Sequence, residues 1–357
     1  MAAFLDAVGL ISGFLGILQF GIDNFAEPES VGSTVRIAVG LDSADGKGGT
    51  NLGGDLPDVR LWNEAGEFLG LKVDPGKVED GGFHDITIKH NSDSTQQATY
   101  TLFSANNDAI CVAYATITWP NGDKYAWSGN WGHQCGGSWY YSNVYVGESN
   151  EKPDCLWIDG DNNQPQTGFQ VHWPEFANKS DAVPGDTQGK EDKFDYLCKA
   201  GPPFKMYHYP EEKDPRSITY WIPKNSRSVS NRRTLATGSS YGPSKYPAVP
   251  RFQPGTHHRR SNQTTIPTSP GTSLVIGNTE RHSVEGLCQS ATSFGPDFMN
   301  TQSGTFCRMS DKTIWPVCNA AGNATDNCFN SVLNQLILNG VAARDEPYRK
   351  VIDWTST

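Results

Sequence analysis

Two polar loops carry the residue types that bind a hard metal ion. Residues 42–55 are rich in Asp and Gly, and residues 159–163 place two Asp and one Asn at alternate positions, as an EF-hand loop begins. The second loop departs from that pattern, because Gln164 stands where the turn glycine belongs and Gln170 where the bidentate glutamate belongs. Each loop is therefore open to two interpretations, a calcium site or a turn whose side chains bond to its own backbone. The candidate calcium ligands are Asp42, Asp45, Asp159 and Asp161, and no other cofactor is expected.

No catalytic residue is singled out by its spacing. The stretch Cys135-Gly-Gly-Ser138-Trp139 is similar to the nucleophile region of papain-like proteases, but Ser138 occupies the position of their nucleophilic cysteine. Nucleophile elbows, phosphate-binding glycine loops, dinucleotide fingerprints and zinc-protease motifs are absent from the sequence. A carboxylate pair for glycoside hydrolysis cannot be chosen among 39 acidic residues. We therefore expect a protein that is not an enzyme.

Aromatic residues are dense between positions 119 and 141. Such rings either fill a β core or stack on the flat apolar face of a sugar. Core filling is their commoner use, and carbohydrate binding is the alternative, with Trp131 as the ring chosen to test it. The rings in question are Trp119, Trp127, Trp131, Trp139, Tyr140 and Tyr141.

The eight cysteines are candidates for disulfide bonds. Their number is even, and neither a C-x-x-C pair nor a histidine at zinc-finger spacing accompanies them. Their pairing cannot be deduced from the sequence. Three glycosylation sequons and two dibasic pairs are compatible with an extracellular or cell-surface location. The candidate disulfide residues are Cys111, Cys135, Cys155, Cys198, Cys288, Cys307, Cys318 and Cys328.

The C-terminal cysteines belong to a longer pattern. It comprises His282-Ser283, Leu287-Cys288, Gly295-Pro296-Asp297-Phe298, Phe306-Cys307, Pro316-x-Cys318 and Cys328-Phe329, with Cys155 to Asp161 earlier in the chain. This pattern resembles uncharacterised proteins of filamentous fungi over about a third of the chain. The resemblance implies a fungal origin and supplies no active-site residue.

An apolar helix is predicted for the first 25 residues, because apolar side chains recur there at alternating spacings of four and three. A row of glycines would let another backbone approach closely. A cleaved export signal is one alternative, but no basic residue precedes Arg36 and no small-residue cleavage site follows the apolar run. A membrane span is another, but the uncharged residues 7–22 would extend only about 24 Å at ~1.5 Å per residue, short of ~30 Å of hydrocarbon. The predicted oligomerisation residues are Phe4, Val8, Gly9, Ile11, Gly13, Leu15, Gly16, Leu18, Ile22 and Phe25.

The net charge of −10 is unevenly distributed. From Pro215 to Asn278 the chain has nine basic residues and no acidic one, which leaves 29 − 9 = 20 basic residues against 39 acidic ones elsewhere. Such an arm can bind nucleic acid, dock on an acidic protein surface or form a solvated linker. Nucleic acid is not an expected partner, because no recognised nucleic-acid-binding motif accompanies the arm. The residues assigned to the basic arm are Arg227, Arg232, Arg233, Arg259 and Arg260.

The rest of the chain is expected to be mainly β. Apolar and polar residues alternate over positions 34–41, which predicts a half-buried strand. Asn121-Gly122 predicts the turn of a hairpin. About ten short strands separated by turn signals indicate an antiparallel β-sandwich or jelly roll. We predict four parts: an apolar helix (1–30), a β-sandwich (31–178), a polar then basic Pro/Ser-rich arm (179–271), and a Cys-rich C-terminal segment (272–357) that packs on the sandwich.

The C-terminal segment is predicted to be α+β. Its helix is expected from Asp326 to Ala342, because the apolar residues at 329, 332, 333, 336 and 337 share one helical face. Asp326 is the predicted N-terminal cap of that helix.

These features favour a structural protein that assembles with copies of itself into an oligomer or a filament, through the N-terminal helix and the basic arm. The first alternative is a membrane-active, toxin-like protein that forms pores, with a membrane surface as its partner. The second is a lectin-like protein that binds carbohydrate.

Overall fold

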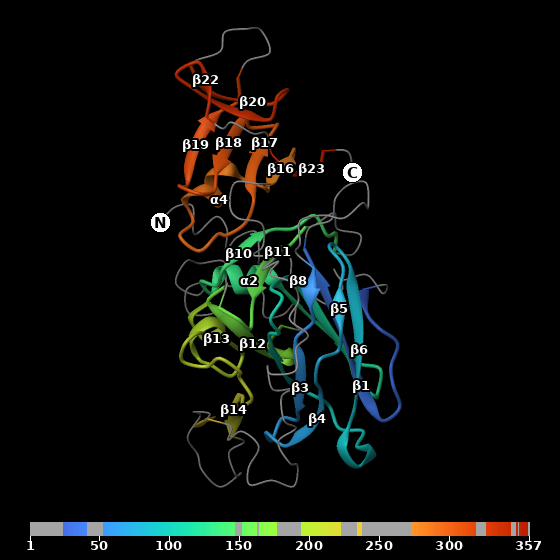
Figure 1. Cartoon of the computed structure of the whole chain (residues 1–357). Helices are drawn as coiled ribbons and strands as arrows, with labels where there is room; N and C mark the ends of the chain where they lie inside the picture. The colour runs from blue at the N-terminus through green and yellow to red at the C-terminus, as the bar shows by residue number, and fades with distance from the viewer. Residues whose placement is uncertain are drawn as a thin grey trace.

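The computed structural model describes residues 24–40, 53–146, 152–162, 164–176, 194–222, 273–318, 326–343, 348 and 350–355, and the backbone of residues 234–237. Figure 1 shows two large sheets and, at one end of them, a separate C-terminal part in orange and red. The structure is mainly β with mostly antiparallel pairing, as the sequence predicts. The predicted N-terminal helix up to residue 23 and most of the basic arm lie outside the described residues.

Sheet 1 has the strand order β10-β11-β8-β1-β6, and β9 also pairs with β8. All of its pairs are antiparallel. The predicted hairpin is confirmed: β8 and β9 are joined by a tight turn in which Gly122 has a φ of 86°. The strands of sheet 1 are β1 (Gly32–Val39), β6 (Phe83–Lys89), β8 (Ile110–Thr118), β9 (Lys124–Ser128), β10 (Trp139–Tyr141) and β11 (Asp154–Ile158).

Sheet 2 has the order β13-β12-β7-β3-β4 and is also antiparallel throughout. Its strands are β3 (Asp58–Trp62), β4 (Phe68–Lys72), β7 (Tyr100–Ser104), β12 (Gln166–His172) and β13 (Phe204–His208). Two short ribbons accompany the sheets, β2 (Gly54–Asp55) with β5 (Lys77–Val78) and β14 (Thr219–Ile222) with β15 (Thr234–Thr237). The described helical turns of this part include η3 (Asn91–Asp93), α2 (Gly129–Gln134), η5 (Trp173–Phe176) and the helical residues 194–199.

The largest core cluster of the described residues draws on both sheets. Val35 and Ile37 of β1 belong to it, and so do Leu61 of β3, Phe103 of β7 and Phe169 of β12. These side chains alternate along their strands with residues of the opposite face, so each strand gives one side to this core. The rings of Phe103 and Phe169 stack at a centroid distance of 4.6 Å. The apolar side of each of these strands therefore faces the other sheet, and the core lies between the two sheets.

Strand β1 is buried on both faces, which corrects the prediction of a half-buried strand. On the face away from the main core, Arg36 makes a bidentate ion pair with Asp85 of β6, at 2.6 and 2.8 Å, and lies against the Phe83 ring. Residues 24–26 run across the same side of sheet 1, where Thr116 Oγ1 and Thr118 Oγ1 donate to backbone carbonyls of that segment. Polar positions of the strand are covered because neighbouring segments supply their partners.

The C-terminal segment, here residues 273–355, forms its own mixed sheet in the order β19-β18-β17-β16-β23. Strand β16 is parallel to both β17 and β23, while the outer pairs are antiparallel. Helix α4 (Val284–Gln289) begins at Ser283, whose side chain accepts a hydrogen bond from Gly286 N. The strands are β16 (Ser273–Gly277), β17 (Asp297–Asn300), β18 (Thr305–Arg308), β19 (Thr313–Pro316) and β23 (Lys350–Asp353).

The predicted helix from Asp326 to Ala342 is wrong. This stretch forms three antiparallel strands, β20 (Asn327–Asn330), β21 (Gln335–Leu338) and β22 (Val341–Ala342). Its turns use Asn334, Asn339 and Gly340, all with positive φ. Asp326 caps no helix, and its backbone carbonyl instead accepts from Gly340 N in the strand turn. The asparagine residues favour turns over a continuous helix, although the apolar spacing would suit one helical face.

A second core cluster joins sheet 1 to the C-terminal segment. It contains Trp157 and Tyr140 of sheet 1 together with Phe298 and Trp354 of the C-terminal segment. The hydroxyl of Tyr140 donates to the Pro296 carbonyl at 2.9 Å, so the polar tip of this buried ring is satisfied across the junction. Burial raises the pKa of Tyr140 well above its usual range, which keeps the hydroxyl protonated as a donor.

Candidate functional site

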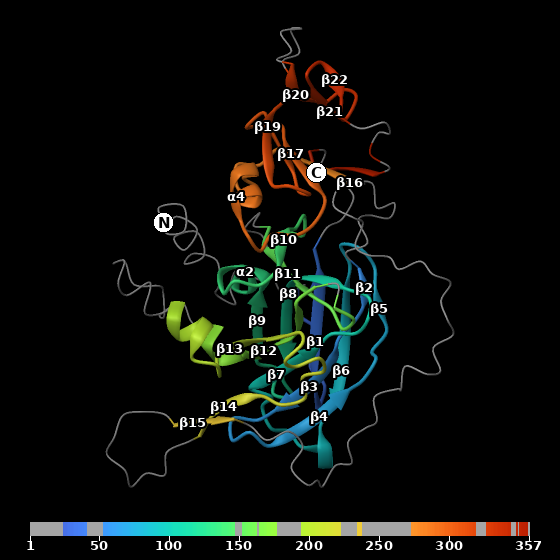
Figure 2. The same cartoon turned by 60° about the vertical axis from the view of Figure 1, so that its left-hand side comes forward.

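A cavity of about 890 Å³ lies near the end of the two sheets that is remote from the C-terminal segment. Both views place β14, which contributes one wall, at that end (Figures 1 and 2). The cavity is bordered by the β3–β4 turn, the residues before β7, the β8–β9 hairpin, the end of β12 with η5, and the helical residues 194–199. The lining residues are Glu64, Gln97, Thr99, Trp119, Tyr125, His172, Pro174, Glu175, Tyr196 and Trp221.

Two pairs of aromatic rings belong to the lining. Trp119 and Tyr125, on either side of the hairpin turn, have centroids 4.3 Å apart with planes tilted by 39°. Tyr196 and Trp221 lie almost parallel, with an interplanar angle of 6° and centroids 6.2 Å apart. Rings that are held in such contacts present rigid apolar faces at little entropic cost on binding.

A histidine between two carboxylates forms the polar part of the cavity. His172 Nε2 is 2.8 Å from Glu64 Oε2, and Nδ1 is 3.5 Å from Glu175 Oε1, the latter an ion-pair contact too long for a good hydrogen bond. The imidazole stacks on Tyr100 at 4.2 Å. Burial acts to lower the pKa of His172, but the contacts with Glu175 and Glu64 outweigh it and raise the pKa above its usual value. The histidine thus holds both carboxylates at fixed positions.

The wall that carries Trp221 belongs to the cover segment, residues 214–222, which lies on the outer face of sheet 2. Gln170 of β12, fully buried, fastens it: its amide Nε2 donates to Thr219 O at 2.6 Å and its Oε1 accepts from Thr219 N at 2.8 Å. Tyr207 of β13 adds a bond from its hydroxyl to Ser217 O at 2.7 Å. Because each of these groups is buried, losing one partner would leave the other unsatisfied.

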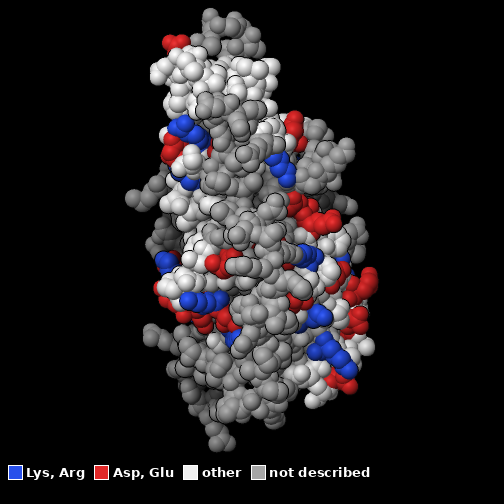
Figure 3. Space-filling view, in the orientation of Figure 1, with Lys and Arg blue, Asp and Glu red and all other residues white. Residues whose placement is uncertain are grey.

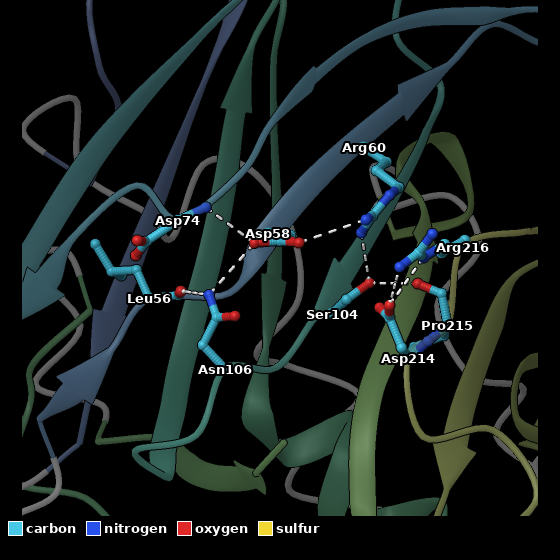
Figure 4. Close-up of polar contacts among 9 residues, drawn as sticks. All are labelled: Leu56, Asp58, Arg60, Asp74, Ser104, Asn106, Asp214, Pro215 and Arg216. Carbon is cyan, nitrogen blue, oxygen red and sulfur yellow. Dashed lines mark hydrogen bonds and ion pairs between the residues drawn. The ribbon is translucent and has the colours of Figure 1, made fainter. Parts of the chain in front are cut away.

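A buried ion pair anchors the start of the cover segment (Figure 4). Asp58 and Arg60 sit two residues apart on β3, so both point to the outer face of sheet 2, and their side chains are almost fully buried. Arg60 Nη1 donates to Ser104 Oγ at 2.9 Å, and Ser104 Oγ donates to Pro215 O at 2.5 Å. The network therefore joins β3 and β7 to the backbone that leads to Trp221.

The helical residues 194–199 carry Tyr196 and are fixed by a disulfide. Cys198 is bonded to Cys135, directly after α2, with a Cα–Cα distance of 5.2 Å. Tyr196 also donates from its hydroxyl to Glu175 Oε1 at 2.7 Å. The disulfide and this hydrogen bond together set the position of the Tyr196 ring beside Trp221.

All eight cysteines are paired, which confirms the disulfide prediction. The pairs are Cys111–Cys155, Cys135–Cys198, Cys288–Cys307 and Cys318–Cys328.

The predicted calcium residues are not brought together where the structure describes them. Asp159 is buried and its Oδ2 accepts from Gln164 N at 3.3 Å, whereas Asp161 is exposed to solvent. This arrangement matches the turn interpretation of the loop. Across the described ranges, no three His, Cys, Asp or Glu side chains are grouped so that they could hold a metal ion. Asp42 and Asp45 lie outside the described residues, and calcium binding stays a prediction.

The aromatic stretch singled out in the sequence is mainly core. All six rings are buried, and only Trp119 also lines the cavity. Trp131 packs edge-on against Phe176 in the main core and does not belong to the cavity lining, and its role in sugar binding stays a prediction. Spacing gave no signal for Tyr196 and Trp221, because they are distant in sequence and meet only in the fold.

The predicted interaction segments are mostly not described. The oligomerisation residues from Phe4 to Ile22 and all five basic-arm arginines lie outside the described residues. Phe25 is described and is buried in its own chain, in the cluster that joins sheet 1 to the C-terminal segment, with the Lys124 ammonium 5.6 Å from its ring centroid. This ring is therefore engaged within the subunit.

Comparison with protein-family models and with curated proteins gives no match. Of the helices within the described ranges, none combines the length and the apolar character that a bilayer crossing requires.

Proposed function

We propose that this protein binds carbohydrate through the aromatic cavity. One observation carries the proposal: Tyr125, Tyr196 and Trp221 come from three separate segments and line a single cavity together with two carboxylates, while the buried Trp119 packs against Tyr125. The ring faces suit the C–H face of a sugar, and the carboxylate oxygens accept hydrogen bonds from its hydroxyl groups. About 890 Å³ falls within the usual range of small-ligand sites and suits a short oligosaccharide.

We propose a binding role in place of catalysis. Both carboxylates are in contact with His172, and Glu175 also accepts from Tyr196, so the polar groups form a fixed hydrogen-bonding frame. We also infer that sheets 1 and 2 form a β-sandwich, an inference supported by the core they share.

The test is glycan binding by the intact, disulfide-bonded protein, first on an array and then by calorimetry on the best ligand. Replacing Trp221 or Tyr196 with alanine is expected to weaken binding about tenfold each, since a ring contact contributes about 0.5 to 1.5 kcal/mol and 1.4 kcal/mol is tenfold. Tyr145, an exposed ring outside the cavity, gives the matched control Tyr145→Ala. Equal affinities for the cavity variants and the parent protein would refute the proposal.

Self-association is the second candidate function. The observation that favours it concerns the small sheet β20–β22, where the side chains of Val332, Leu333 and Val341 are exposed. Asp326 is the single charged residue among the described residues 326–343. Figure 3 shows charges of both signs mixed over the described surface of the two-sheet part, and few on the end that carries this sheet. Exposed apolar side chains on a part of the surface with few charges are typical of contacts between proteins.

We propose that this surface and residues 1–23 contribute to an oligomer. Deleting residues 2–23, or combining Val332→Ser with Val341→Ser, is expected to reduce the mass measured by light scattering after size exclusion. Glu285→Gln, on the exposed side of α4, serves as the surface control. A parent protein that is already monomeric at micromolar concentration would exclude this function.

A further inference from the structure

The amine of Lys312 contacts neutral atoms only among the described residues. Lys312 stands in the turn directly before β19, and its Nζ donates to Ser293 O at 2.7 Å and to Ser293 Oγ. The Met309 sulfur lies 3.8 Å from the same nitrogen. No described acidic side chain forms an ion pair with Lys312, so its ammonium form would be partly buried without a counter-ion.

The carboxylate next to Lys312 in the sequence is engaged elsewhere. Asp311 Oδ1 accepts from Arg308 Nε at 3.0 Å and from Thr313 Oγ1 at 2.7 Å, and Arg308 Nη2 also donates to Asp311 Oδ2. The hydrogen bonds from Arg308 hold the pKa of the Asp311 carboxyl below its usual value. The negative charge of Asp311 therefore stabilises the guanidinium of Arg308 and not the amine of Lys312.

Burial without a counter-ion favours the uncharged amine. Burial lowers the pKa of Lys312 from 10.5 to about 8. At pH 7 about one amine in ten is then uncharged, against about one in 3,000 for a lysine with the ordinary pKa of 10.5. Lys312 is of intermediate exposure, so it is not sealed in the core and a small molecule can approach it.

The hydrogen bonds of Lys312 also suit the uncharged amine, which has two N–H groups and one lone pair. The two Ser293 oxygens accept from both N–H groups, so the lone pair is not used by a hydrogen bond. Ser293 Oγ donates its own hydrogen to Leu287 O at 2.6 Å, which leaves this oxygen as an acceptor for the amine. A desolvated amine of this kind is the nucleophile of lysines that form Schiff bases.

We propose that Lys312 is a modification site, whose amine forms a covalent imine with small aldehydes. The lone pair of the uncharged nitrogen bonds to the carbonyl carbon, and the carbonyl oxygen takes up the proton that the nitrogen releases. The carbinolamine then loses water and leaves a C=N bond, so no oxidant or reductant is consumed. This inference does not depend on carbohydrate binding, because Lys312 lies outside the cavity lining.

The experiment is competitive labelling of the full-length, disulfide-bonded protein with a limiting amount of isotope-labelled formaldehyde. Cyanoborohydride traps each imine as a methylated amine, and mass spectrometry gives the initial rate at each lysine. At pH 7 Lys312 is expected to react about tenfold faster than the exposed Lys89 and Lys199, because its larger uncharged fraction outweighs its weaker basicity and its partial burial. Its rate is expected to level off above about pH 8. A rate at Lys312 no higher than at the two exposed lysines would overturn the proposal.

A pair of matched variants tests whether the missing counter-ion is the cause. Met309→Glu places a carboxylate beside the amine and is expected to lower the labelling rate of Lys312 about tenfold. Met309→Gln has a side chain of similar length without the charge, and is expected to change the rate less than twofold. Equal rates at Lys312 in the two variants would overturn the cause assigned here. If neither variant folds, the pH profile of the parent decides, since a rate at Lys312 that still rises between pH 9 and pH 10 would equally overturn it.

Discussion

Replacing His282 with phenylalanine is expected to make the protein more stable in acid. His282 lies at the junction between sheet 1 and the C-terminal segment, where its ring stacks on Tyr141 at 4.5 Å and lies edge-on to Trp354 at 5.4 Å. Neither ring nitrogen has a hydrogen-bond partner among the described residues. A protonated imidazole would therefore place an unpaired charge inside an apolar junction.

The magnitude follows from the pKa of the imidazole. Burial lowers the pKa of His282 from 6.5 to about 3, and the charges of Lys152 and Arg281 add to the lowering. Between these two values the unfolded chain binds the proton and the folded chain does not, so the free energy of unfolding falls as the pH falls. At about 1.4 kcal/mol for each pKa unit, the loss reaches about 2 kcal/mol at pH 5 and about 3 kcal/mol at pH 4.

The assay is denaturant unfolding of the parent protein and of His282→Phe at pH 7, 5 and 4, followed by tryptophan fluorescence. The variant is expected to gain about 2 kcal/mol over the parent between pH 7 and pH 5, because other titrating groups cancel in the comparison. His84→Phe, at an exposed position of β6, is the control. His282→Leu tests the same charge with a smaller side chain, in case the phenylalanine ring is too large for the site. Parallel stability curves for the parent and both variants over this pH range would refute the reasoning.

Two further predictions concern the walls of the cavity. Gln170→Leu is expected to lower the free energy of unfolding by about 3 kcal/mol or more, because Thr219 N and O lose their buried partner, and to weaken ligand binding through Trp221. The control Gln289→Leu, an exposed change on α4, should change the free energy of unfolding by no more than about 0.5 kcal/mol. Equal effects of the two substitutions in denaturant unfolding would contradict the assignment. Replacing Cys135 and Cys198 together with serine opens a link across 63 residues and is expected to cost about 2 to 4 kcal/mol, with weaker glycan binding in calorimetry; unchanged binding would show that Tyr196 needs no covalent support.

Much of the two-sheet part could be predicted from short-range patterns. Alternation along β1 and the Asn121-Gly122 turn indicate strands and a hairpin, since both depend on neighbouring residues only. Burial of the second face of β1 could not be predicted, because Arg36 finds its partner Asp85 49 positions further along the chain. The predicted helix at 326–342 failed for the opposite reason: an apolar spacing of three and four residues is also produced by two short strands and a turn.

The cavity was beyond sequence reasoning. Its rings come from the β8–β9 hairpin, residue 196 and residue 221, and their convergence depends on a disulfide and on buried hydrogen bonds whose pairing no local pattern encodes. The one available signal was the abundance of tryptophan and tyrosine, but these residues fill a β core at least as often as they line a binding site. Charge was equally uninformative, because Glu64 and Glu175 are two of 39 acidic residues.

The pairing of the cysteines divides the chain in an unexpected way. Two bonds lie before residue 199 and two lie after residue 287, and none connects one group with the other. A single cut by a protease anywhere from 223 to 272 would thus yield two polypeptides that migrate separately in detergent without reductant. In native buffer the same two pieces are expected to remain associated through the aromatic cluster between them.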